Sequence, residues 1–199
     1  MTKPRILAFA GSTRTDSFNK KLVKIAASGA TEAGADVTII DLRDFPMPIY
    51  DGDLEQREGL PHNARKLKDL MLAHQGFLIS SPEYNSSISA VFKNTIDWAS
   101  RQSEGEIPLA CFKEKVAGIM SASPGGLGGL RGLVHVRSIL ENIGVIVIPD
   151  QMAVAKAHEA LNTDGTLKDK KQEDQVKKIG SNVAKILLKL MIETKKTGI

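Results

Sequence analysis

The sequence is poor in the residues that form covalent cross-links and metal sites. Cys111 is the only cysteine among 199 residues, which excludes an intramolecular disulfide, a paired redox thiol and a cysteine cluster for zinc or iron–sulfur. The histidines share no i,i+3 or i,i+4 spacing, so no metal site is expected; they are His62, His74, His135 and His158. Any electron chemistry would therefore depend on a bound cofactor.

Long apolar runs are also absent. No stretch approaches the roughly 20 apolar residues of a membrane-spanning helix, because the most hydrophobic segments, 6–10 and 145–148, are short. The basic start of the chain leads into an apolar segment that ends at Gly11, too early for the core of a signal peptide. We therefore expect a soluble, cytoplasmic protein with no membrane partner.

Positive charge is only in slight excess, with a formal net charge of +4. Much of it comes from lysines in the last third of the chain, where acidic residues interrupt them and no aromatic residue lies between them. This pattern favours a solvated helix face over a nucleic-acid surface. The mild positive charge would favour anionic small molecules as ligands.

The pattern of apolar residues predicts an α/β fold. Short apolar runs predict strands at 5–10, 37–40, 76–80, 116–120 and 145–148. Helical spacing predicts helices over about 19–32, 64–73, 90–100, 130–143 and 170–194. Strands that alternate with helices, without a hairpin signal, indicate a parallel sheet covered on both faces. We expect a single domain over residues 1–199, with irregular segments at 41–62 and 149–169.

The loop at residues 11–19, Gly-Ser-Thr-Arg-Thr-Asp-Ser-Phe-Asn, joins the first strand to the first helix. Hydroxyls, an arginine and the N–H groups at the start of a helix are the donors that a phosphate needs. The loop contains neither of the glycine patterns of dinucleotide-binding folds and P-loop NTPases. A phosphate cradle is therefore favoured over its alternative, an ordinary helix start capped by Ser17.

Two further loops should reach the same end of the sheet. In a doubly wound sheet, ligands bind beyond the carboxyl ends of the strands, at the point where the strand order reverses. Residues 82–85, Pro-Glu-Tyr-Asn, follow the third strand and offer backbone groups beside an aromatic ring, which suits a flat heteroaromatic ligand. A turn in which Glu83 acts as a cap explains the segment equally well. Residues 121–126 follow the fourth strand, and their glycines permit close approach of the backbone to a ligand.

Together these segments resemble the NADPH-dependent FMN reductase family. The resemblance is carried by Gly-Ser-x-Arg-x-x-Ser-x-Asn at 11–19, Pro-Glu-Tyr-Asn at 82–85, Lys93-Asn94 with Asp97-Trp98, and Gly-Gly-x-Gly-Gly at 125–129. It implies a flavodoxin-like three-layer sandwich with a five-stranded parallel sheet in the order 2-1-3-4-5. It also implies FMN as cofactor, NADPH or NADH as co-substrate, and quinones, chromate, azo or nitro compounds as small-molecule electron acceptors.

The same resemblance assigns residues. The FMN phosphate would be held by Ser12, Arg14, Ser17, Phe18 and Asn19; the isoalloxazine would be lined by Pro82, Glu83, Tyr84 and Asn85; its reactive edge would be approached by Ser123 and Gly125. Thr13 and Pro124 depart from the usual family pattern. No dedicated catalytic acid or base is expected, because the flavin supplies the chemistry. The family also implies a homodimer or homotetramer.

Two other functions are compatible with FMN binding. A flavodoxin-type electron carrier would bind FMN without turnover of NAD(P)H, but such carriers are usually acidic and this chain is basic. A flavin-dependent sensor would regulate a partner, yet the sequence shows no appended partner domain. Oxidation of NADPH in the presence of a quinone distinguishes the enzyme from both.

Overall fold

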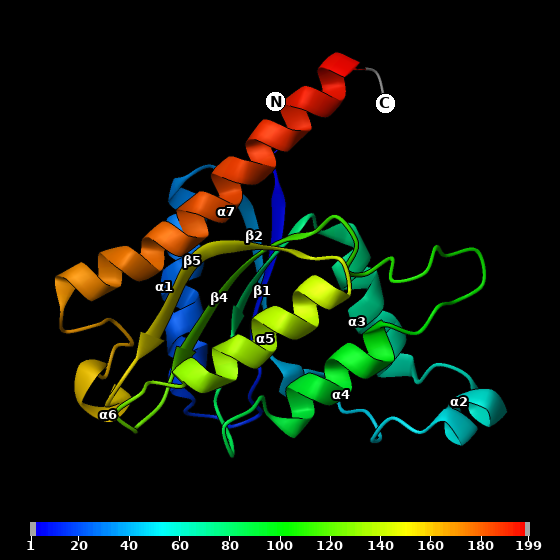
Figure 1. The fold of residues 1–199 in the computed structure, drawn as a ribbon, viewed down its shortest axis with the longest axis horizontal. Coiled ribbons are helices and arrows are strands. Elements are labelled where there is room, and N and C mark those ends of the chain that lie inside the picture. Colours follow the sequence, from blue (N-terminus) through cyan, green and yellow to red (C-terminus); the bar gives the residue numbers. More distant parts are fainter. Residues whose placement is uncertain (1–2, 198–199) are drawn as a thin grey trace.

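The computed structural model of the chain describes residues 3–197, and the side chains of residues 3–193. The predicted domain limits, residues 1 and 199, lie outside this range. The fold is built on a five-stranded parallel sheet in the order β2-β1-β3-β4-β5 (Figure 1). Its strands are β1 (Arg5–Ala10), β2 (Asp36–Ile40), β3 (Gly76–Ser80), β4 (Val116–Ala122) and β5 (Ile146–Val154). The order confirms the predicted flavodoxin-like sheet.

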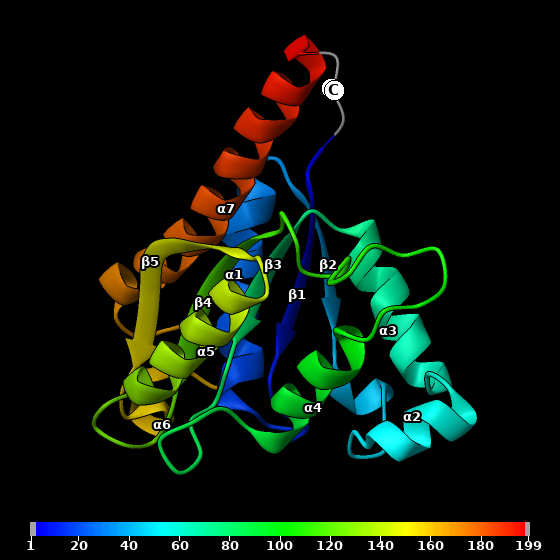
Figure 2. The same ribbon diagram turned by 45° about the vertical axis from the view of Figure 1, so that its right-hand side comes forward.

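Helices cover both faces of this sheet. One face carries α1 (Phe18–Glu32) and α7 (Lys170–Thr197), and the other carries α3 (His62–Ala73), α4 (Ala90–Ala99) and α5 (Leu130–Asn142) (Figures 1 and 2). Successive residues of β1 alternate between the two cores, with Ile6 and Ala8 on the α1 side and Leu7 and Phe9 on the other. Because both faces are covered, the central strands are continuous apolar runs.

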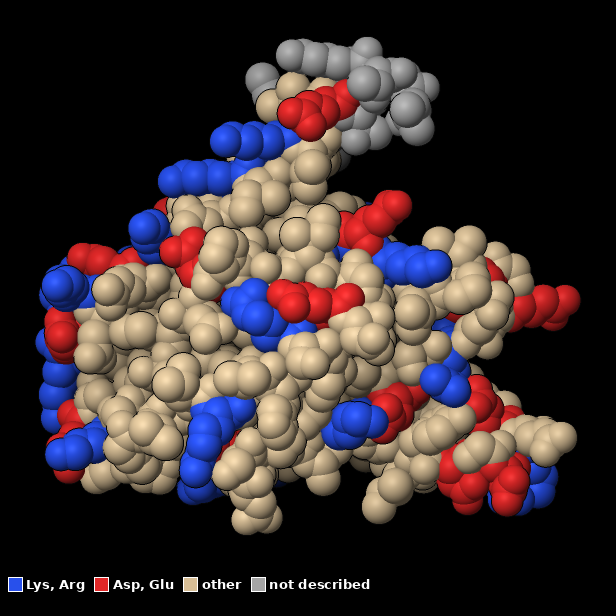
Figure 3. All heavy atoms as spheres, in the orientation of Figure 1, with Lys and Arg blue, Asp and Glu red and all other residues tan. Residues whose placement is uncertain are grey.

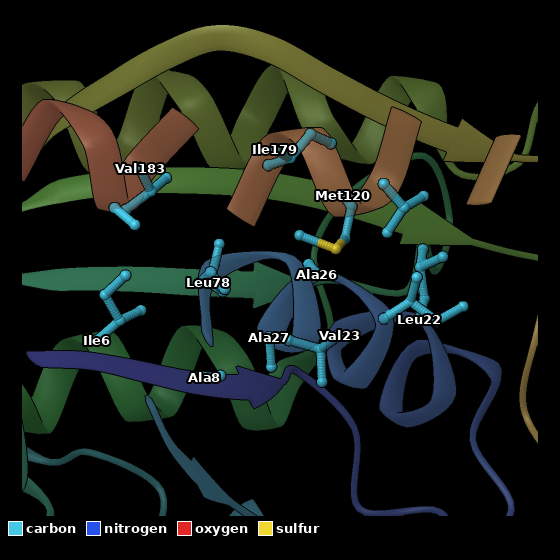
Figure 4. Close-up of a cluster of buried hydrophobic side chains, with 14 of the residues drawn as sticks. Ile6, Ala8, Leu22, Val23, Ala26, Ala27, Leu78, Met120, Ile179 and Val183 are labelled. Atoms are coloured by element: carbon cyan, nitrogen blue, oxygen red, sulfur yellow. The ribbon is translucent and has the colours of Figure 1, made fainter. Parts of the chain in front are cut away.

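Helices α1 and α7 pack with their backbones in contact. A Cβ atom at Gly29 would overlap the Lys177 carbonyl, and one at Gly180 would overlap the Ala26 carbonyl. Figure 4 shows Val23, Ala26 and Ala27 of α1 in the buried cluster on this face of the sheet, which also contains Ile179 and Val183 of α7. This close packing holds α1 in place, and with it the loop that precedes its first residue.

Two segments expected to be irregular contain regular structure, so this part of the prediction was wrong. Within 41–62 lie a 3-10 helix, η1 (Leu42–Asp44), and α2 (Gly52–Glu58); within 149–169, β5 continues to Val154 and α6 (Ala157–Ala160) follows. Asp41 and Asp51 each start their helix by accepting a bond from the N–H two residues on. These helices are too short to show helical periodicity. The end of β5 resumes pairing with β4 only after a register shift between Ala117 and Ile119, which no apolar run marks.

A buried ion pair attaches the loop after α4 to α3. The side chain of Lys68 is 1% exposed, and its Nζ lies 2.6 Å from Oε2 of Glu106. Arg65 donates to the other oxygen of this carboxylate at 2.9 Å. Burial opposes ionisation of Glu106, but the bonds from Lys68 and Arg65 outweigh it and lower its pKa to about 2. The loop after α4 is therefore held to α3 by an ion pair, and removing one partner would leave the other charge unpaired in a poorly solvated site.

Candidate cofactor-binding site

Three loops meet beyond the carboxyl ends of β1, β3 and β4, toward the lower edge of the view in Figure 2. They enclose a pocket that contains most of the predicted site residues. Its lining consists of Ser12, Arg14, Ser17, Phe18, Asn19, Pro82, Glu83, Tyr84, Ala122, Ser123 and Pro124. Among the described residues, the predicted Asn85 and Gly125 lie outside this lining. Ala122 and Pro124 belong to the loop at 121–126 that was expected here, but neither was assigned as a cofactor-binding residue.

The first loop ends at a helix start whose N–H groups are not capped by a side chain. Ser17 occupies the N-cap position with φ −92° and ψ 126°, yet its hydroxyl caps no N–H group within residues 3–197. None of the first four helical residues is acidic. The Ser12 hydroxyl accepts a bond from the Arg14 N–H at 3.3 Å, and the Arg14 side chain lies in the exposed part of the loop. The positive end of the helix dipole therefore faces the pocket with no side-chain cap and no acidic residue in the first turn of α1.

Residues that directly follow β2 bond to the first loop and to the first turn of α1. Arg43 of η1 donates to the hydroxyl of Thr15, and Lys20 pairs with Asp41 at 2.5 Å. Burial opposes ionisation of Asp41, but the bonds from Lys20 and the Arg43 N–H prevail and lower its pKa. No sequence pattern predicts these contacts, because residues 41–62 carry no apolar periodicity.

Asn19 joins three elements through its buried side chain. Its Nδ2 donates to the Ala122 carbonyl at 2.9 Å, while its Oδ1 accepts from the Ala122 N–H at 3.0 Å and from the Ser80 hydroxyl at 2.8 Å. β3 ends at Ser80, whereas β4 continues to Ala122. The amide thus satisfies the backbone of β4 where β3 has ended. We assign Asn19 the role of positioning the phosphate loop against the loops after β3 and β4.

The second loop turns back on itself at Tyr84–Ser87. Tyr84 and Ser87 exchange backbone hydrogen bonds of 2.9 and 3.0 Å. The two central residues have positive φ, 50° at Asn85 and 64° at Ser86. Asparagine tolerates this left-handed conformation better than serine does, so the turn holds local strain. Asn85 is not part of the pocket lining, whereas Tyr84 lies at the rim of the pocket with 50% of the residue exposed.

The carboxylate of Glu83 caps the start of α5. It accepts a bond from the Gly132 N–H at 2.9 Å and pairs with Arg131 at 2.8 Å. Burial opposes its ionisation, but the bonds from Gly132 and Arg131 outweigh this effect and lower the pKa of Glu83. The structure thus confirms the alternative in which Glu83 acts as a cap. Its contribution to the site is to hold the second loop against α5.

The third loop is covered by the end of β5. The Ser123 N–H donates to the Val154 carbonyl at 3.2 Å, and the Gly125 carbonyl accepts from the Lys156 N–H at 3.1 Å. Gly125 therefore shapes the loop from outside the pocket. At the base of the loop, the Ser121 hydroxyl is buried and finds no hydrogen-bond partner in the described part of the chain.

Other reactive side chains lie apart from this site. Within residues 3–197, no group of three or more His, Cys, Asp or Glu could hold a metal ion. His74 is buried between the Leu70 carbonyl and the Thr38 hydroxyl. Cys111 is buried, and burial raises its pKa to about 11. A thiol with this pKa is protonated near neutral pH and is a poor nucleophile.

A profile of the NADPH-dependent FMN reductase family matches residues 4–159. The chain belongs to this family. Its relatives include a probable NADPH:quinone oxidoreductase of Oryza sativa, 34% identical over 177 residues, which cover 87% of this chain and 83% of the relative. A quinone reductase of Escherichia coli K12 is 35% identical over 150 residues, covering 73% and 74% of the two chains.

Solved structures agree with this assignment. FerB of Paracoccus denitrificans, described as a flavoenzyme NAD(P)H:(acceptor) oxidoreductase, has a TM-score of 0.78 at 27% identity, over 94% of this chain and 98% of that chain. An archaeal flavodoxin has a TM-score of 0.60 at 10% identity, over 92% and 98% of the chains. At that identity the likeness concerns the fold alone. This member of the FMN reductase family is an oxidoreductase that has FMN as its cofactor and NAD(P)H as co-substrate.

The side chains and backbone groups that line the pocket are of the kinds that FMN needs. The uncapped start of α1 and the side chain of Arg14 lie at the end that suits a phosphate. Tyr84 and Pro82 lie at the other end, where a flat ring needs a face contact and backbone partners. Tyr84 is 50% exposed at the rim of the pocket, so a ring bound against it would remain accessible to substrates.

In the described structure no helix is long and apolar enough to cross a membrane.

Proposed function

We propose that this protein uses NAD(P)H and bound FMN to reduce quinones and other small electron acceptors. The observation that carries the proposal is the meeting of an uncapped helix start with an exposed aromatic loop in one open pocket. The relatives named as quinone reductases support quinones as the first acceptors to test. Chromate, azo compounds and nitro compounds are further candidates, because an exposed ring selects weakly for acceptor shape.

Each part of the site would have its own task. The hydroxyls of Ser12 and Ser17, the Arg14 guanidinium and the first N–H groups of α1 would bind the FMN phosphate. The loop at 82–85 and Ser123 would orient the ring and exclude water from one of its faces. FMN, when bound, accepts two electrons from NAD(P)H and delivers them to an acceptor. No acid–base residue is assigned, since proton exchange can occur with solvent at the open rim.

The open rim also predicts the order of events. The loops after β3 and β4 would cover one side of the ring, so that NAD(P)H and the acceptor share the remaining side and bind in turn. Such alternation is a ping-pong mechanism. A ternary complex would require separate sites for the two substrates.

The decisive experiment measures NADPH and NADH oxidation by the purified, FMN-loaded protein with and without a soluble quinone. A rate that depends on quinone concentration supports the reductase. A flavodoxin-type carrier would bind FMN but show no steady turnover with either nicotinamide. Free FMN at the same concentration is the control for non-enzymatic reaction.

We also propose that the protein works as a homodimer or homotetramer in the cytoplasm. Leu127, Leu130 and Val134 are 53%, 45% and 60% exposed beside the pocket. On the face over α5, uncharged surface lies between a few charged side chains (Figure 3). An exposed apolar patch of this kind is typical of a contact between subunits. Light scattering coupled to gel filtration tests this, with a monomer as the outcome that contradicts it.

A further inference from the structure

A second cavity of about 520 Å³ lies on the far side of the phosphate loop from the ring-binding loops. It opens between the carboxyl ends of β1 and β2, at the same edge of the sheet as the cofactor pocket. Ser17 lines both cavities. The rest of its wall comes from the first turns of α1 and from residues 39–45.

The wall of this cavity combines an apolar surface with charged side chains. Ile39 is 47% exposed, and Phe45 and Val23 lie with it in the lining. Three lysines of α1 and three aspartates also line the cavity: Lys20, Lys21, Lys24, Asp16, Asp41 and Asp44.

Most of these charges neutralise one another. Lys20 pairs with Asp41 at 2.5 Å, and Lys21 pairs with Asp16 at 2.7 Å. Within residues 3–197, Lys24 has no ion-pair or hydrogen-bond partner, and neither does the carboxylate of Asp44. The cavity therefore offers one free cation, one free acceptor and an apolar wall. A nucleotide has the matching parts, which are a phosphate, hydroxyl and amino donors, and a flat base.

We propose that this cavity binds the adenosine 2′-phosphate end of NADPH, with Lys24 as the residue that distinguishes NADPH from NADH. The proposal rests on the function proposed above. Lys24 contacts the 2′-phosphate, which NADH lacks, and Asp44 accepts from the ribose or the adenine. The adenine ring lies against Phe45 and Ile39.

The position of the cavity suits a dinucleotide. The ring-binding loops follow β3 and β4, and the cavity lies at β1 and β2 in the order β2-β1-β3-β4. Neighbouring strands are about 4.8 Å apart, so the two spacings between the middle of β2 and β1 and the middle of β3 and β4 amount to about 10 Å. A dinucleotide can span this distance between its two rings. Its pyrophosphate then passes over the exposed part of the loop that contains Arg14 and Thr15.

The test compares Lys24→Ala with the wild type in the FMN-loaded protein. Lys24 is exposed, so its loss leaves the packing intact. We expect the KM for NADPH to rise about ten-fold, the effect of losing one charge-assisted contact, while the KM for NADH, the kcat and FMN affinity stay unchanged. Calorimetry with 2′,5′-ADP and 5′-AMP measures the site directly, and the preference for 2′,5′-ADP should disappear in the variant. Lys178→Ala on α7, another exposed lysine, is the matched control.

The outcomes separate this proposal from the proposed function. If NADPH is oxidised but neither its KM nor 2′,5′-ADP binding depends on Lys24, the reductase stands and the assignment of the cavity is wrong. An equal rise in KM for NADPH and NADH also overturns it, because the contact would not involve the 2′-phosphate. If 2′,5′-ADP binds through Lys24 and no acceptor supports NADPH oxidation, the cavity stands and the proposed function fails.

Discussion

Replacing Asn19 with alanine would remove the buried amide that joins the phosphate loop to the ends of β3 and β4. Three hydrogen bonds disappear, and the Ala122 N–H, the Ala122 carbonyl and the Ser80 hydroxyl lose this partner in a region without access to water. Each buried polar group left unsatisfied costs about 1–3 kcal/mol. Allowing for some relaxation, we expect the free energy of unfolding to fall by about 3–5 kcal/mol.

The effect on ligand binding distinguishes positioning from direct contact. Because Asn19 holds the phosphate loop and the two ring-binding loops together, Asn19→Ala should weaken FMN and riboflavin by similar factors. Urea unfolding of the cofactor-free protein gives the stability, and fluorescence titration with each flavin gives the affinities. Asn19→Asp is the matched variant, since its carboxylate can still accept from Ser80 and from the Ala122 N–H but cannot donate to the carbonyl. It should be affected in the same direction.

One result would refute this reasoning. If Asn19→Ala unfolds at the same urea concentration as the wild type and loses affinity for FMN but not for riboflavin, then Asn19 is a phosphate ligand and not a positioning residue. If Asn19→Ala is too unstable to purify, Asn19→Asp is used in its place in both the unfolding and the titration experiments.

The remaining predictions concern the phosphate, the buried ion pair, the helix contact and the kinetics. Arg14→Ala should weaken FMN about ten- to a hundred-fold and leave riboflavin nearly unchanged; equal losses in fluorescence titration would contradict a phosphate contact. Because the pKa of Glu106 is lowered to about 2 in the folded protein, its contribution to stability is full above pH 5 and is lost as the pH falls toward 2. Glu106→Gln should therefore be less stable at pH 7, by about 3 kcal/mol, and should show a flatter dependence of unfolding free energy on pH between 5 and 2; an unchanged slope would contradict the pairing. Gly180→Ala should force α1 and α7 apart and lower the melting temperature, whereas Ser181→Ala, the neighbouring control, should not. Double-reciprocal plots at several quinone concentrations should give parallel lines, and intersecting lines would show a ternary complex.

The sequence by itself determined most of the strands and longer helices, and it predicted the loops that we propose to bind the cofactor. Apolar runs and helical spacing are local properties of the chain, so β1, β3 and α1 could be predicted close to their observed limits. The motif at 11–19 is local as well, because a phosphate needs donors from one short loop and one helix start. The resemblance to the reductase family supplied the strand order, which pattern alone left open.

Only the tertiary structure decided which side chains are free to bind ligands. Asn19 belongs to the same motif as Arg14, and Glu83 belongs to the motif at 82–85. Their polar groups are nevertheless used on Ala122 and on Gly132 of α5, which lie 103 and 49 residues away in the chain. Ser17 occupies the N-cap position of α1, yet its hydroxyl caps no helix N–H group in the described structure. The cavity beside Lys24 exists because residues 39–45 fold against α1. Contacts between residues distant in sequence depend on packing, and no local pattern encodes them.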